Sequence, residues 1–246
     1  MTTPITSSPS NSTAFLVHRD VLYFTRNLQY PVGALIEGVW ALVPDQARAI
    51  TRNRIFSSHP LTHLCEGMLM VAAKRSSYFD SEVYQQKFLA TSHLSRIEVS
   101  LPGTEIFPSL RSIPSESLSE DQAMETAERL AKNSSLGIAA VLLDEDKKIV
   151  SYGWNNHFPN KILHAEIMLV KNFVAQYKSI IPKNYTLIST LQPCAMCAGY
   201  LHQHCEDFNS LKIIYKDTDP GKFAQNSILV PGSYLYKKRF LDSISK

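Results

Sequence analysis

The sequence has few cysteines and no long apolar run, and both absences restrict what the chain can be. Cys65, Cys194, Cys197 and Cys205 are the only cysteines in 246 residues, which is typical of a reducing compartment and not of a disulfide framework. No apolar stretch approaches the roughly 20 residues that a membrane-spanning helix needs. The first ten residues have neither the basic start nor the apolar core of a signal peptide. We therefore expect a cytoplasmic protein without a membrane partner.

Charge is also modest, both in amount and in excess of one sign. Charged residues make up 19% of the chain, hydrophobic residues make up 44%, and the formal net charge is +3. These values describe an ordinary globular protein. A mildly basic chain permits an anionic partner such as RNA without requiring one. Composition alone therefore does not select a function, and the motifs must do so.

The stretch from Gln192 to Gly199 contains a Cys-x-x-Cys motif that predicts part of a metal site. Proline suits the first position of a helix, so Pro193 predicts that Cys194 and Cys197 lie in the opening turn of one. Residues three apart share a helix face, and a helix N-terminus stabilises the thiolates that bind metal. A tetrahedral zinc ion is the expected ligand. Taken alone, the motif is also compatible with a structural zinc knuckle or a redox pair.

A second motif, His164-Ala165-Glu166, adds the groups that a catalytic zinc requires. His164 stands at the start of a segment whose apolar residues recur at helical spacing. Together with Cys194 and Cys197 it gives three protein ligands, which leave the fourth position of the ion to water. H-x-E…P-C-x-x-C is the signature of zinc deaminases, in which the glutamate acts as general acid and base. We therefore predict a catalytic role for Glu166.

The chain is expected to form two domains. Residues 1–13 read as a disordered tail, residues 14–110 as a smaller N-terminal domain of α/β or α+β type, and the Pro- and Ser-rich residues 111–118 as a linker. A capping box then opens the larger domain, residues 119–246. Its alternation of strands and helices predicts an α/β fold with a mixed, largely parallel sheet sandwiched by helices. Both metal-bearing helices would begin at one edge of that sheet.

The larger domain resembles the zinc-dependent cytidine/adenosine deaminase superfamily, and within it the tRNA adenosine deaminase branch most of all. Three stretches carry this resemblance: Gly153-Trp154-Asn155, His164-Ala165-Glu166-Ile167-Met168 and Thr190-Leu191-x-Pro193-Cys194-x-Met196-Cys197-Ala198-Gly199. The resemblance implies a cytidine-deaminase-like fold and one zinc ion held by His164, Cys194 and Cys197. It also implies that Glu166 moves protons and that Asn155 and Ala165 contact the substrate.

The implied reaction is hydrolytic deamination, in which an exocyclic amine of a nucleobase becomes a carbonyl and ammonia is released. Adenosine in tRNA or another RNA is the leading substrate. Gln192, at a position where the branch commonly has Glu, leaves a free base, nucleoside or nucleotide of cytosine, guanine or pterin type as the alternative. A catalytically inactive relative that binds RNA or a partner is the second alternative. The resemblance further implies a homodimer, or a pseudo-dimer formed within the chain by the N-terminal domain.

Two further segments lead to weaker expectations. The basic run Lys237-Lys238-Arg239 can contact RNA phosphates, although such runs are also typical of a solvated face. The N-terminal domain can be a decayed copy of the deaminase fold, because Leu64–Leu69 shares three of six residues with His164–Leu169. In that alignment Leu64 and Gly103 occupy ligand positions, so the copy would not bind zinc. An unrelated α+β domain is the alternative.

Overall fold

The protein consists of two compact units that divide between Pro102 and Gly103. The computed structural model describes residues 13–73, 78, 79, 81–101, 116–156 and 160–244. The division falls among residues 102–115, which lie outside the described residues together with residues 1–12 of the expected tail. Nowhere in the described chain is a helix both long enough and apolar enough to cross a membrane.

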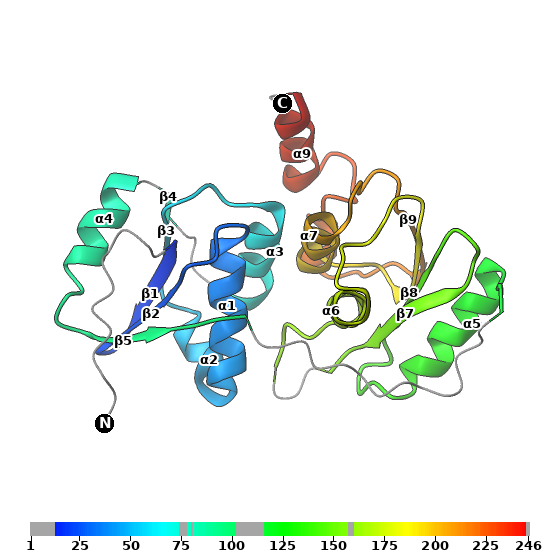
Figure 1. Ribbon diagram of the computed structural model, residues 1–246, viewed down its shortest axis with the longest axis horizontal. Helices are drawn as coiled ribbons and strands as arrows, with labels where there is room; N and C mark the ends of the chain where they lie inside the picture. The colour runs from blue at the N-terminus through cyan, green and yellow to red at the C-terminus, as the bar shows by residue number, and fades with distance from the viewer. Residues whose placement is uncertain (1–12, 74–77, 80, 102–115, 157–159, 245–246) are drawn as a thin grey trace. The chain divides into compact units, whose positions relative to one another are not determined.

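The N-terminal unit contains a five-stranded mixed sheet (Figure 1). Its strands are β1 (Ala14–His18), β2 (Val21–Thr25), β3 (Ile55–Ser57), β4 (Tyr78–Phe79) and β5 (Ser95–Glu98), in the order β4-β3-β1-β2-β5. β1 is antiparallel to β2 and β3, whereas the outer pairs β2-β5 and β3-β4 are parallel. The helices are α1 (Pro31–Leu42), α2 (Pro44–Ile50), α3 (His63–Ala72) and α4 (Ser81–Leu89).

Residues 14–25 form a β-hairpin from β1 and β2. His18 pairs with Val21, so Arg19 and Asp20 form a two-residue turn in which Arg19 has a positive φ of 55°. Such a turn matches the twist of the two strands that it joins. One face of this sheet is aromatic: the Phe15 ring stacks on Phe56 at 4.9 Å and meets Phe88 of α4 edge-on at 5.3 Å. The core of the N-terminal unit therefore lies partly between the sheet and α4.

The C-terminal unit contains a four-stranded sheet with helices on both faces. Its elements are α5 (Glu120–Ala131), β6 (Ala139–Leu143), β7 (Ile149–Trp154), α6 (Ala165–Tyr177), β8 (Thr186–Leu191), α7 (Ala195–His204), β9 (Lys212–Asp217), α8 (Lys222–Gln225) and α9 (Tyr234–Ile244). α5 begins at the predicted capping box, in which Ser119 and Gln122 exchange side-chain and backbone hydrogen bonds. α5 packs on one face of the sheet and α6 on the other, as predicted (Figure 1).

The prediction of a largely parallel sheet is wrong. The strand order is β7-β6-β8-β9, and β6 is antiparallel to both of its neighbours, so only β8 and β9 form a parallel pair. α6 connects β7 to β8. These two strands run in the same direction, but they lie on either side of β6 and are not paired with each other. The continuous apolar sequence of β6 reflects burial between two helical layers, and such burial is not confined to parallel strands.

A glycine allows α6 to lie close against β7. A Cβ atom added at Gly153 would stand 2.3 Å from the carbonyl oxygen of Ala165 and 2.5 Å from the backbone nitrogen of Leu169. The hydroxyl of Ser151 also donates to the carbonyl of Leu169 at 2.7 Å. These contacts fix the first turns of α6 on the strand, and the histidine motif stands at the start of that helix.

The predicted alignment of Leu64 with His164 is wrong. The helix that follows the first hairpin is α1, whereas α3, which contains Leu64, lies between β3 and β4. The shared Glu, Met and Leu residues reflect an amphipathic pattern that many helices have in common. Gly103, the other aligned position, lies outside the described residues.

Candidate metal centre

The N-terminus of α6 is fixed by the end of β7. His164 is the N-cap residue, with extended backbone angles of φ −73° and ψ 161°. Asn155 follows β7 directly, and its Oδ1 accepts the backbone N–H of Ala165 at 2.6 Å. Asn155 is 4% exposed, so this bond is shielded from water. The strand thereby sets where the helix starts and where the His164 side chain is presented.

The N-terminus of α7 presents the two cysteines. The helix begins at Ala195, so Cys194 is the N-cap residue and Cys197 lies three positions later in the first turn. The prediction that Pro193 is the first helical residue is therefore wrong, because Pro193 precedes the N-cap. The backbone N–H of Gln192 donates to the carbonyl of Asp217 at 2.9 Å, which holds this approach beside the end of β9.

His164, Cys194 and Cys197 come together as a compact set of donors. The His164 Nδ1 lies 3.7 Å from the Sγ of Cys194 and 3.4 Å from the Sγ of Cys197, and the two sulfurs are 3.6 Å apart. A tetrahedral zinc with bonds of about 2.3 Å to sulfur and about 2.0 Å to nitrogen gives edges of about 3.8 Å between sulfurs and about 3.5 Å from sulfur to nitrogen. The three donors therefore fit one zinc ion. Within the described residues they form the group suited to this role.

Burial and mutual contact set the protonation of these donors. The hydrogen bond from Cys197 lowers the pKa of Cys194 well below its usual value. Burial raises the pKa of Cys197, and the neighbouring Cys194 raises it further. A bound dication would reverse the shift at Cys197, because a coordinating thiol loses its proton outright. The arrangement thus holds one thiolate readily and yields the second to a metal.

Glu166 stands beside the three donors as a buried carboxyl. It is 3% exposed, and its Oε1 accepts a hydrogen bond from the hydroxyl of Ser189 at 3.1 Å. Burial raises the pKa of Glu166, and the negative charge of Cys194 adds to the effect. A carboxyl whose pKa is raised toward neutrality is suited to accept and release protons.

A cavity of about 200 Å³ opens onto this cluster. It is lined by Leu136, Ile138, Asn155, His164, Glu166, Leu191, Gln192, Cys194 and Asp219. Pockets for drug-sized ligands measure roughly 300–1,000 Å³, so this cavity suits one small group such as a base. The structure brings Asn155 to the cavity but does not place Ala165 on its lining. Ala165 is fully buried, and its N–H is already bound to Asn155.

Two polar residues of this cavity were not predicted as site residues. Asp219 lies two residues beyond β9, where its Oδ1 accepts the N–H of Gly221 at 2.7 Å. Because β8 and β9 are parallel, their carboxyl ends meet at one edge, and that rule could have identified Asp219. Gln192 was noted only as a departure from the family pattern. Its Oε1 is buried and has no hydrogen-bond partner among the described residues.

A second cavity, of about 560 Å³, adjoins the first. The two share the apolar residues Leu136, Ile138 and Leu191. The larger cavity also reaches Lys132 and Lys216, and the Lys216 ammonium bonds Glu128 at 2.5 Å. A ligand larger than one base therefore has room to extend from the metal cluster along this side of the unit.

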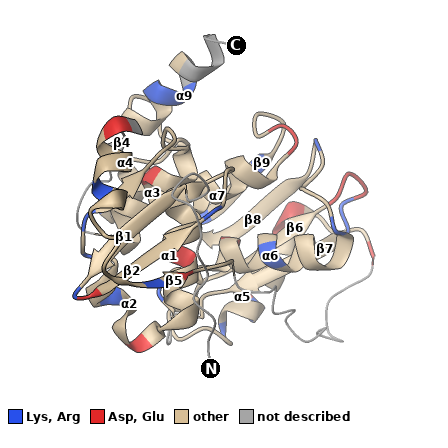
Figure 2. Cartoon of the chain, turned by 60° about the vertical axis from the view of Figure 1, so that its left-hand side comes forward, with Lys and Arg blue, Asp and Glu red and all other residues tan. Residues whose placement is uncertain are grey.

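The basic run near the C-terminus lies on α9 (Figure 2). Its three residues do not point the same way, because consecutive helical positions are about 100° apart. The Arg239 guanidinium lies 5.1 Å from the centre of the Phe208 ring, whereas Lys237 is exposed. Contact of this run with RNA remains a prediction, and Lys237 is the residue best placed for it.

Comparison with known proteins agrees with this site. Residues 130–234 match the model of the Bd3614-like deaminase family. The matched segment contains every residue of the metal cluster. Two relatives are tRNA-specific adenosine deaminases. That of Haemophilus influenzae is 34% identical over 79 residues, 31% of this chain and 46% of the relative. That of Rickettsia bellii is 34% identical over 81 residues, 32% of this chain and 56% of the relative. The chain thus spans about half the length of these relatives.

Solved structures give more distant likenesses. One, from a study of A-to-I editing by tRNA:A34 deaminases at the wobble position, is 23% identical with a TM-score of 0.37, covering 44% of this chain and 83% of the other. The guanine deaminase of Bacillus subtilis is 16% identical with a TM-score of 0.36, covering 41% of this chain and 66% of the other. At TM-scores below 0.5, neither structure identifies the fold or the activity of this chain.

Proposed function

We propose that the C-terminal unit is a hydrolytic deaminase that converts an exocyclic amine of a nucleobase into a carbonyl and releases ammonia. The observation that carries the proposal is the buried carboxyl of Glu166 beside His164, Cys194 and Cys197 in one small cavity. Burying an ionisable group costs free energy. A structural zinc site has no need for such a group, whereas a proton-transfer reaction does.

His164 would hold a zinc ion through Nδ1, and Cys194 and Cys197 would hold it through their sulfurs. A zinc ion bound there would lower the pKa of a water molecule enough to supply a nucleophile near neutral pH. Zinc is thus the cofactor that this donor set fits, with one ion in the C-terminal unit.

Glu166 would carry the protons of the reaction. Its carboxylate takes a proton from the attacking water and delivers it to the ring nitrogen beside the carbon under attack. The second proton of that water leaves with the amine as ammonia, so the atoms balance as amine plus water giving carbonyl plus ammonia. Ser189 holds Oε1 of this carboxyl at 3.1 Å, which fixes its direction during both transfers. Proton transfer of this kind typically contributes about 10²–10⁴-fold to the rate.

Adenosine in tRNA is the substrate that we propose. Support comes from the relatives described as tRNA-specific adenosine deaminases. Support also comes from the larger adjoining cavity, which offers room for a nucleotide next to the reacting one. Enzymes that act on a base in a nucleic acid take that base out of its stack into a pocket. The cavity of about 200 Å³ would receive the base.

A free base or nucleoside is the alternative substrate. It is favoured by Gln192, because a neutral amide in the small cavity can pair with a base without any contact to phosphate. An inactive, RNA-binding relative is a different kind of protein and would lack turnover on every substrate.

One experiment separates these possibilities. The zinc-loaded protein is incubated with total tRNA and, separately, with a panel of free bases, nucleosides and nucleotides. Deamination is read from the mass increase of 1 Da that replacement of NH by O produces. Inosine in tRNA supports the proposal, product from the free panel alone supports the alternative, and no product from either indicates a binding protein.

A further inference from the structure

We propose that the N-terminal unit is a second copy of the deaminase fold that has lost its metal site. The order β2-β1-β3-β4 in its sheet repeats the order β7-β6-β8-β9 of the C-terminal sheet. The strand directions repeat as well. β1 and β6 are each antiparallel to both of their neighbours, whereas the pairs β3-β4 and β8-β9 are parallel. β5 is an additional strand at the far edge, beside β2.

The helices are inserted at the same points of the chain. α1 follows the hairpin of the first unit as α6 follows the hairpin of the second, and each packs on the strands of its hairpin. α3 lies between β3 and β4 as α7 lies between β8 and β9. α1 packs against α3, and α6 packs against α7. α2, between α1 and β3, has no counterpart in the C-terminal unit. The rest of the strand–helix order is shared and is stronger evidence than the letter match between Leu64–Leu69 and His164–Leu169.

The strand register aligns the two units residue by residue. Ala14 pairs with Ser57 across β1 and β3, and Ala140 pairs with Ser189 across β6 and β8. The next pair toward the same side is Phe15–Phe56 in one unit and Val141–Ile188 in the other. An Ala–Ser pair therefore occupies the same sheet position in both units, and the next pair is apolar in both.

This register identifies the equivalent of the cysteine motif. Thr62, the N-cap residue of α3, lies five residues after Ser57, just as Cys194, the N-cap residue of α7, lies five residues after Ser189. The alignment of β3 and α3 with β8 and α7 therefore needs no insertion or deletion. Cys65 then aligns with Cys197, and two residues later Gly67 aligns with Gly199.

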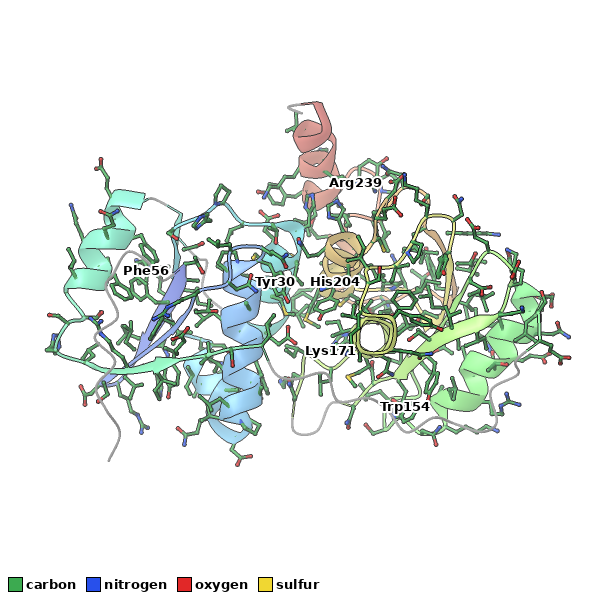
Figure 3. The ribbon with its side chains drawn as sticks, viewed as in Figure 1. Tyr30, Phe56, Trp154, Lys171, His204 and Arg239 are labelled. Carbon is green, nitrogen blue, oxygen red and sulfur yellow. The ribbon has the colours of Figure 1, made fainter. Side chains whose placement is uncertain are left out.

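The N-termini of α1 and α3 also meet, as those of α6 and α7 do. A Cβ at Gly33, in the first turn of α1, would lie 3.2 Å from the Tyr30 ring and 3.4 Å from Leu64 in the first turn of α3. Tyr30, the N-cap residue of α1, stands where His164 stands on α6. Burial raises the pKa of Tyr30, and the nearby charges of Glu37 and Cys65 act in the same direction. Tyr30, labelled in Figure 3, is thus close enough to Cys65 to interact with it, as His164 is to Cys197.

An asparagine repeats as well. The Asn27 Oδ1, just beyond β2, accepts the N–H of Tyr30 at 2.9 Å, whereas the Asn155 Oδ1, just beyond β7, accepts the N–H of Ala165. In both units an asparagine after the hairpin therefore holds the start of the following helix.

The two copies differ in the helix that covers the other face of the sheet, away from α1 and α6. In the C-terminal unit α5, which precedes the sheet in the chain, covers the face that carries Val141 and Ile188. In the N-terminal unit α4, which follows β4 in the chain, covers the equivalent face, which carries Phe15. The same apolar face is buried in both units by helices from different parts of the sequence.

In the N-terminal unit, the positions equivalent to the zinc ligands and the catalytic glutamate keep one of the four side chains. Tyr30, Val32 and Thr62 stand in place of His164, Glu166 and Cys194, and Cys65 remains in place of Cys197. A phenol, a hydroxyl and a single thiol do not form a zinc site of the kind seen in the C-terminal unit. The N-terminal unit would therefore hold no catalytic metal.

Restoring the ligands tests the inference in the full-length chain. The variant Tyr30→His with Thr62→Cys supplies a histidine and a second cysteine beside the native Cys65. We expect it to bind two zinc ions per chain where the wild type binds one, as measured by metal analysis after dialysis. Adding Cys65→Ser to the variant is expected to return the count to one. A folded variant, with its first zinc intact, that still binds one ion would overturn the proposal.

A cross-link tests the strand register without disturbing the buried tyrosine. The variant Ala14→Cys with Ser57→Cys puts two thiols at directly paired positions, whereas Ala14→Cys with Ser58→Cys is one residue out of register. On oxidation we expect a disulfide in the first variant and not in the second, read as loss of thiol alkylation at both sites by peptide mass. A disulfide absent from the first variant, or formed equally in both, contradicts the proposed register. Neither experiment measures deamination, so they are independent of the proposed function.

Discussion

At the scale of single residues, Glu166 is the part of the site that most needs an explanation. It is almost fully buried and next to two thiols, where a negative charge is unfavourable. A residue that merely filled this space would be expected to be apolar. Its retention beside His164, Cys194 and Cys197 is therefore an argument from chemistry and not from packing.

Glu166→Gln is expected to keep both fold and zinc while losing most turnover. The amide has nearly the same shape but cannot take a proton from water, and general acid–base catalysis is worth about 10²–10⁴-fold. Turnover on the substrate identified by mass is compared with that of the exposed control Glu125→Gln, whose activity should not change. Equal rates in the two variants would remove Glu166 from the mechanism.

The same carboxyl makes the stability of the metal-free protein depend on pH. The folded-state pKa of Glu166 is raised above its usual value of 4.5, so its proton is held more tightly in the folded state. Its contribution to stability is full below that usual value and declines as the pH rises through the folded-state pKa. Urea unfolding gives the free energy of unfolding of the metal-free wild type and of Glu166→Gln. From pH 4 to pH 7 this free energy should fall for the wild type relative to the variant. A constant difference would show that the pKa is not raised.

At the scale of elements, the sequence predicted the helix starts better than the sheet. The capping box at Ser119 and the histidine at the start of α6 are local signals, because a cap depends on residues a few positions away. The predicted start of α7 was two residues too early, because Pro193 precedes the N-cap and the first helical residue is Ala195. Strand order depends on pairing between distant segments, which no local pattern specifies. The pairing of β6 with β8 is for this reason antiparallel where a largely parallel sheet was predicted.

The contact between α6 and β7 predicts the effect of a single methyl group. Gly153→Ala would place a Cβ within 2.5 Å of two backbone atoms of α6, which cannot rotate away as a side chain can. Overpacking of this kind typically costs about 1–3 kcal/mol. We expect a lower unfolding midpoint and weaker zinc binding, because His164 moves with the helix. Unfolding and zinc titrations that match the wild type would show that the strand and helix can separate without loss.

At the scale of the whole molecule, the sequence predicted two parts but aligned them incorrectly. Residue letters suggested that α3 matches α6, whereas the strand register matches α3 with α7. Few identities link the two units, so the letters alone could not identify the correct helix. The pairing of Ala14 with Ser57 required knowledge of which strands are neighbours.

The molecule as a whole is expected to bind one zinc ion. Cys194→Ser and Cys197→Ser should lose the metal and destabilise the C-terminal unit, because metal binding and folding are linked. Cys65→Ser and Cys205→Ser are the controls. Burial, with a contribution from Asp207, raises the pKa of Cys205 to about 12, so it does not offer a thiolate. Metal analysis decides: loss of zinc from either control, or full zinc in Cys194→Ser and Cys197→Ser, would contradict the ligand assignment.

The apolar residues shared by the two cavities divide substrates by how strongly their KM depends on ionic strength. A molecule confined to the smaller cavity stays on one side of Leu136, Ile138 and Leu191 and does not reach Lys132 or Lys216. Its KM should be almost indifferent to ionic strength. A polyanion that extends past these residues meets Lys132 and also Lys216, which is paired with Glu128, and added salt weakens such binding. The slope of KM against salt concentration therefore reports how far along this side of the protein the true substrate extends.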